Sequence, residues 1–141
     1  MKEIIFLATF MLTLAFTMPL FAAFESSTVN GKVIVTDTET GLIWQKTYGS
    51  GKTWQQALDY CENLTYAGHS DWRLPNKNEL ASLVNYAKYD PASDFPDMPS
   101  QYFWSSSTRS DDTDCAWGVH FGYGGVSSSG KTSSILVRCV R

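Results

Sequence analysis

The side chains best suited to chemistry lie close together over residues 111–120, where an acidic run is followed by Cys115 and His120. A cysteine becomes a nucleophile when a base lies within hydrogen-bond reach, and His120 is the nearest such base in sequence. The adjacent Asp114 opposes this role, because a neighbouring carboxylate raises the pKa of a thiol. The pattern therefore favours an idle or buried thiol, with a small thiol-dependent enzyme as the alternative.

Three carboxylates in one turn, Asp111, Asp112 and Asp114, carry the oxygen ligands that calcium prefers. An EF-hand needs a longer loop with a central glycine and a terminal glutamate, and both are absent here. The second histidine, His69, has no metal-ligand spacing to a cysteine or to His120. We expect a solvated acidic turn with no metal and no cofactor, so calcium at these aspartates is only a weak candidate.

The composition excludes some partners. The net charge is −3, and lysine and arginine are not clustered, so the chain lacks the basic patch that binding to nucleic acid phosphates requires. Aromatic residues make up 14% of the sequence, including five tryptophans. Many of these rings must fill the core of so small a domain, but aromatic rings also form carbohydrate-binding surfaces.

Residues 1–22 have the charged, apolar and small-residue regions of a secretory signal peptide, with Lys2 first and Ala22 at the preferred cleavage position. Cleavage after Ala23 is the second choice, and an uncleaved membrane anchor is the alternative. Pro19 disfavours a continuous spanning helix. The expected location is therefore the periplasm or the exterior, with membrane contact only during export.

The remaining sequence predicts a short lead-in over residues 23–31 and one domain over residues 32–141. A hairpin is expected over residues 32–45, helices starting after Thr53 and Asn76, and a long irregular loop over 88–102. Thr53 with Gln56, and Asn76 with Glu79, have the spacing of capping boxes. Later strands are expected at 103–107, 116–121 and 135–140, with a Ser/Gly loop at 127–134. Two helices followed by short antiparallel strands predict an α+β domain.

Three cysteines, Cys61, Cys115 and Cys139, leave one thiol unpaired in an oxidising compartment. The count alone allows any of the three pairings.

Three sequence pieces together resemble the Lcl C-terminal domain family, named after a Legionella collagen-like adhesin. The first is the run 71–80, the second is 103–107 and the third is the closing 137–141. The motif residues expected to be structural are Trp72, Arg73, Leu74, Pro75, Asn76, Glu79 and Trp104.

This resemblance implies a C-type-lectin-like fold with two helices, small antiparallel sheets and long irregular loops. In such folds the terminal strands pair, and a cysteine of the first helix bonds one in the last strand. The resemblance thus implies a Cys61–Cys139 disulfide and a free Cys115. The Glu-Pro-Asn, Gln-Pro-Asp and Trp-Asn-Asp runs of calcium-dependent sugar-binding lectins are absent.

Lectin-like folds bind ligands through long loops, which here are residues 89–102, 109–114 and 122–131. The ligand-binding residues predicted on them are Tyr123, Arg109, Asp112, Tyr102 and Tyr89. The expected function is an exported, non-catalytic binding or adhesion module for a surface glycan or protein. One alternative is a thiol enzyme related to formylglycine-generating and sulfatase-modifying folds, which share an Arg-Leu-Pro run. The other is a purely structural envelope protein.

Overall fold

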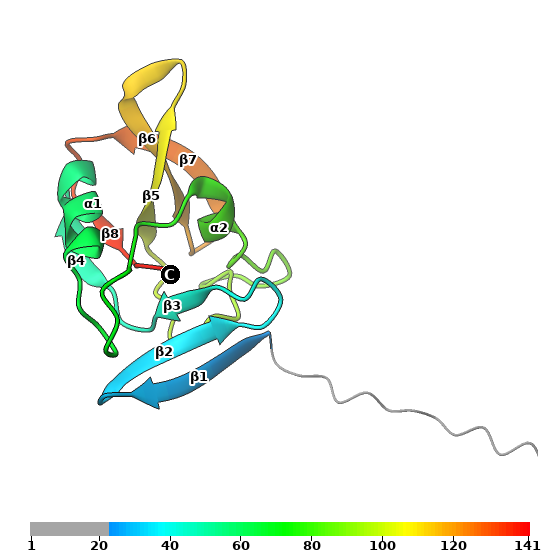
Figure 1. Cartoon of the computed structure of the whole chain (residues 1–141). Coiled ribbons are helices and arrows are strands. Elements are labelled where there is room, and N and C mark those ends of the chain that lie inside the picture. The colour runs from blue at the N-terminus through cyan, green and yellow to red at the C-terminus, as the bar shows by residue number, and fades with distance from the viewer. Residues whose placement is uncertain (1–22) are drawn as a thin grey trace, which may run out of the picture.

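The structure is a computed structural model that describes residues 23–141, so the predicted signal peptide lies outside the described residues (Figure 1). It is a mixed α+β domain built mostly of strands, with two short helices and two sheets. The smaller sheet has the order β1-β2-β3 and the larger has the order β4-β8-β5-β6-β7. Within residues 23–141, no helix is long and apolar enough to cross a membrane.

The smaller sheet holds the N-terminal part of the domain. Its strands are β1 (Phe24–Val29), β2 (Lys32–Asp37) and β3 (Ile43–Gln45). The prediction of a hairpin from β2 to β3 is confirmed, but the expected polar lead-in is instead strand β1. Four of the six β1 side chains are exposed, so the segment is polar and has no apolar pattern that would indicate a strand. It forms a strand because its backbone pairs with that of β2.

The larger sheet holds five strands from residues 49–137. Its strands are β4 (Gly49–Lys52), β5 (Tyr102–Arg109), β6 (Asp112–His120), β7 (Gly125–Gly130) and β8 (Ile135–Val137). The predicted Ser/Gly loop at 127–134 is wrong in its first half, because β7 pairs with β6 along its whole length. Serine and glycine are poor strand formers, and the pairing with β6 overrides that preference.

Both helices start where the sequence predicts. They are α1 (Trp54–Glu62) and α2 (Lys77–Ala81), and both capping boxes, from Thr53 and from Asn76, are present. Helix α2 is shorter than expected, because it ends at Ala81 and the irregular loop predicted from residue 88 begins at residue 82. After Ala81 the chain continues in a turn with i→i+3 bonds, which buries Leu83 without further α-helix.

The C-terminal segment ties the two sheets together. Cys139, just beyond β8, forms a disulfide with Cys61 of α1, and Cys115 is free, as the family resemblance implied. The predicted closing strand is split, since only residues 135–137 belong to the sheet. Beyond it, Arg141 exchanges backbone hydrogen bonds with Ile43 of β3 (3.0 and 2.9 Å). The expected pairing of the terminal strands is therefore replaced, because β1 pairs with β2 and the C-terminus lies against β3.

Residues 82–101 form the long irregular connection between α2 and β5 and contain no helix or strand. In Figure 1 this loop lies between the smaller sheet and the β6–β7 turn, while the tip of the β5–β6 hairpin projects at the top. Ala92 in the middle of the loop joins it both to the segment after β6 and to its own first residues. Ala92 donates a backbone hydrogen bond to the Phe121 carbonyl (2.6 Å), and Asn85 donates one to the Ala92 carbonyl (2.9 Å).

Candidate ligand-binding surface

Three largely exposed tyrosines lie on two neighbouring segments, the loop 82–101 and the β6–β7 turn. Tyr86 is 75% exposed and Tyr89 80%, both in the loop 82–101, and Tyr123 is 58% exposed in the β6–β7 turn. Exposed aromatic rings of this size are apolar surface that folding leaves in water, and they are typical of contact sites for ligands. They are the main candidate for a binding surface.

Backbone and ring contacts bring these segments together. Asp90, next to Tyr89, donates its backbone N–H to the Gly122 carbonyl (2.9 Å). Tyr86 lies beside Gly124, where an added Cβ would stand 3.2 Å from the tyrosine ring. Gly124 also has a φ of +78°, which favours glycine in this turn. The β6–β7 turn is thus in contact with the loop segments that carry Tyr86 and Tyr89.

Tyr123 is held by stacking on His120, with ring centroids 4.7 Å apart and an interplanar angle of 18°. His120 is in turn 6.3 Å from the ring of Tyr102, on the partner strand β5. The Tyr102 hydroxyl is already engaged with Ser127 of β7, whose carbonyl it donates to. We call Tyr86, Tyr89, Tyr102, His120 and Tyr123 the tyrosine surface.

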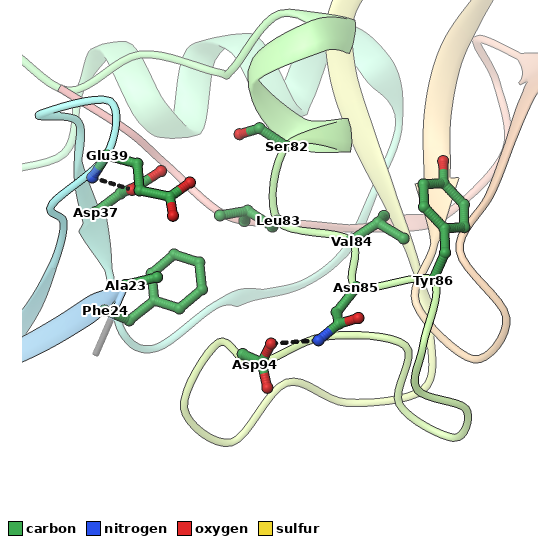
Figure 2. Close-up of a pocket in the computed structure, with 10 residues that line it drawn as sticks. All are labelled: Ala23, Phe24, Asp37, Glu39, Ser82, Leu83, Val84, Asn85, Tyr86 and Asp94. Carbon is green, nitrogen blue, oxygen red and sulfur yellow. Dashed lines mark hydrogen bonds between the residues drawn. The ribbon is translucent and has the colours of Figure 1, made fainter. Parts of the chain in front are cut away.

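A pocket of about 250 Å³ opens beside the tyrosine surface, and Tyr86 is part of its lining (Figure 2). Figure 2 shows Phe24, Asp37 and Glu39 at one end, Tyr86 at the other, and Asn85 bonded to Asp94 below. The volume is below the roughly 300–1,000 Å³ of drug-sized sites, so it suits one small group of a larger ligand.

The pocket is acidic, and its carboxylates differ in how many hydrogen bonds they already accept within the protein. Asp37 is buried and accepts bonds from the backbone of Glu39 (2.9 Å) and the hydroxyl of Thr40 (2.7 Å). Asp94 is half exposed, and hydrogen bonding from Lys88 and then Asn85 lowers the pKa of its carboxyl group. Glu39 is exposed, and so this side of the pocket offers hydrogen-bond acceptors to hydroxyl groups.

The other predicted binding residues lie elsewhere. Tyr102 pairs with His120 at one end of the β5–β6 hairpin, whereas Arg109 pairs with Asp112 at the other end. Arg109 forms a two-point ion pair with Asp111 (2.6 and 2.8 Å), and this hydrogen bonding lowers the pKa of the Asp111 carboxyl group. The structure therefore brings Tyr89, Tyr102 and Tyr123 together and leaves Arg109 and Asp112 apart from them.

The acidic turn does not assemble a metal site in the described residues, where no group of three potential ligand side chains converges. Asp111 is paired with Arg109, while Asp112 accepts from the backbone of Asp114 (3.2 Å) and from the Cys115 thiol (3.3 Å). Hydrogen bonding to Asp112 raises the pKa of Cys115, which favours the thiol over the reactive thiolate.

Cys115 and His120 are five positions apart on one strand, so their side chains point to opposite faces of the sheet. The Nδ1 atom of His120 instead accepts the backbone N–H of Gly122 (3.0 Å). The cysteine–histidine pair that a thiol enzyme would need is not formed between these two residues.

Sequence reasoning missed Tyr86 and the pocket. Tyr86 lies between Asn76, where the second helix was expected to start, and residue 88, where the loop was expected to start, so the sequence assigned it to the helix. Phe24 was placed in a lead-in, and its contact with Phe95 of the loop (5.5 Å between ring centroids) is a tertiary one. The proline-rich composition of the loop was the available signal.

The model of the Lcl C-terminal domain family matches residues 33–141, and the chain belongs to this family. No curated protein matches the chain closely enough to count as a relative.

Proposed function

We propose that the protein is an exported, non-catalytic adhesin-like module that binds a surface glycan through the tyrosine surface. Family membership supports an adhesin-like role, since the Lcl C-terminal domain takes its name from a collagen-like adhesin. We further infer that the domain is of the C-type-lectin-like kind, in which loops beside a rigid sheet contact the ligand.

The observation that carries the proposal is the exposure of Tyr86, Tyr89 and Tyr123 on adjoining segments. A sugar ring presents C–H groups on its faces and hydroxyls at its edge. An exposed tyrosine ring can stack on the first, and acceptors such as Asp94 and Glu39 beside the pocket can bind the second.

The test is a glycan array probed with the domain and with a Tyr86→Ala/Tyr123→Ala double variant. We expect binding to a defined set of glycans that the double variant loses, with an unchanged melting temperature because both rings are exposed. The matched control is Glu62→Ala, which removes an exposed side chain of α1 outside this surface and outside both pockets.

Loss of binding in the control instead of the double variant would contradict this placement. A blank array combined with a protein retained in a pull-down through the same tyrosines would show that the ligand is a protein. Turnover that disappears in Cys115→Ser would favour the thiol enzyme.

A further inference from the structure

A second pocket, of about 470 Å³, lies at the Lys32 end of β2, whereas the pocket beside the tyrosine surface lies at the Asp37 end, and the two have opposite charge. The second pocket is lined by Gly31, Lys32, Val33, Lys46, Thr47, Tyr48, Tyr66 and Asp97. Lys32 and Lys46 are its two cations and Asp97 its one carboxylate. Lys46 and Asp97 form an ion pair with 2.8 Å between Nζ and Oδ2.

Behind this pocket lies Arg138, a guanidinium with 1% exposure. Its Nη1 atom donates to the carbonyls of Gln45 (3.1 Å) and Lys46 (2.5 Å), which places it against the backbone of the pocket wall. Its Nε and Nη2 atoms have no hydrogen-bond partner among the described residues. These two atoms form the edge of the guanidinium that binds carboxylates at two points.

Aromatic rings enclose the guanidinium in place of a carboxylate. Its Cζ lies 4.3 Å from the centroid of Phe95 and 5.6 Å from those of Tyr48 and Phe103. Burial lowers the pKa of Arg138 to about 10, so the group remains charged at neutral pH. Unpaired buried charge costs free energy unless a counter-charge offsets it, and ring faces offset only part of that cost.

Among the described residues, too few carboxylates lie near Arg138 to balance the positive charge of this region. The pocket lining carries Lys32 and Lys46 against Asp97 alone, and the buried guanidinium of Arg138 behind the wall adds a third positive charge. Asp97 is 81% exposed and pairs with Lys46 rather than with Arg138. The lining thus has one excess positive charge, and the unpaired edge of Arg138 lies behind it, in a chain whose net charge is −3; this local excess of positive charge favours an anion.

We propose that this pocket binds a small carboxylate, of the size of a hexuronic acid, that takes the place of Asp97 beside Lys46. Tyr48 and Tyr66 would flank the ligand ring, and Arg138 would supply positive charge from behind Tyr48. Tyr48 lines the pocket, is 44% exposed and has its ring centroid 5.6 Å from the Cζ of Arg138, so the guanidinium charge lies directly behind this ring. This site is independent of the tyrosine surface.

The test titrates glucuronate, glucose and inorganic sulfate into the isotope-labelled full domain and follows backbone amide signals by NMR. We expect glucuronate to shift the signals of residues 46–48 and 97, glucose to leave them unchanged, and sulfate to bind more weakly than glucuronate. Lys46→Ala should weaken glucuronate binding roughly fivefold, and Asp97→Asn should strengthen it by about the same factor, because the competing carboxylate is gone.

The matched control is Lys88→Ala, which breaks another half-exposed lysine–aspartate pair and should leave glucuronate affinity unchanged. Tyr86→Ala should also leave it unchanged, which separates this site from the glycan surface. Equal shifts with glucose, tighter binding of sulfate, or no gain in Asp97→Asn would overturn the proposal. These variants avoid Arg138 itself, whose replacement would disturb the core.

Discussion

Arg73 and Glu79 are joined at two points, with 2.7 Å between Nη1 and Oε1 and 2.6 Å between Nη2 and Oε2. The same Oε1 atom accepts the backbone N–H of Asn76 (2.8 Å), so the ion pair is fused to the capping box of α2. Arg73 also exchanges backbone hydrogen bonds with Val140 (2.9 Å each). The Arg-Leu-Pro run is thereby a corner that fixes the start of α2 to the C-terminal segment.

This corner predicts a pH-dependent stability. Hydrogen bonding from Arg73 lowers the pKa of Glu79, so its contribution is present above the usual value of 4.5 and is lost as pH falls through the lower folded value. Glu79→Gln should cost about 1 kcal/mol of unfolding free energy at pH 7, since the half-exposed Arg73 is partly screened by water. Urea unfolding from pH 7 to pH 2 should show the gap between wild type and variant closing below about pH 4.5. Glu25→Gln, at an exposed position of β1, should show no such gap.

The disulfide predicts a large loss of stability when it is removed. Cys61 and Cys139 are 78 positions apart, and closing such a loop constrains the unfolded chain by about 4 kcal/mol in the chain-entropy model. The double variant Cys61→Ala/Cys139→Ala should therefore unfold at much lower urea concentration. Cys115→Ser, which changes only the free thiol, should unfold near the wild-type midpoint. Non-reducing peptide mapping that finds Cys115 in a bridge would contradict the assignment.

Trp104 is predicted to be a determinant of folding rather than of binding. Its ring is fully buried and its Nε1 atom donates to the Lys52 carbonyl (2.9 Å), so it joins β5 to β4. Trp104→Ala should destabilise the domain by about 3–5 kcal/mol through the cavity it leaves and the unmet carbonyl. Tyr89→Ala, at an 80% exposed ring, is the control and should unfold within about 0.5 kcal/mol of wild type.

Substitutions at the two ends of the β5–β6 hairpin should affect ligand affinity differently. Alanine at Arg109 or Asp112 was expected to weaken ligand binding, but the register places both residues at the end of the hairpin remote from Tyr102. If the ligand is confined to the tyrosine surface, Arg109→Ala binds normally while Tyr123→Ala loses binding. If the ligand spans the hairpin, both variants lose affinity. Surface plasmon resonance on the glycan identified by the array decides between these outcomes, with melting temperatures as the check on folding.

Local features of this domain were readable from the sequence because they depend on residues a few positions apart. Both capping boxes lie within four residues, and the turn at Gly41 needs only its positive φ of +76°. The disulfide was also foreseen, although by resemblance to the family rather than from spacing, since three cysteines allow three pairings.

The tertiary structure decided the sites, because each is assembled from segments distant in the chain. Tyr86 and Tyr123 adjoin only because the loop 82–101 is bonded to the β6–β7 turn. The basic pocket is not visible as a cluster of cations in the sequence, because Lys46 and Arg138 are more than ninety positions apart. They come together in the fold, where the Arg138 guanidinium donates to the Lys46 carbonyl. Strand β1 was hidden for the same reason, as its order comes from pairing with β2 and not from its own exposed side chains.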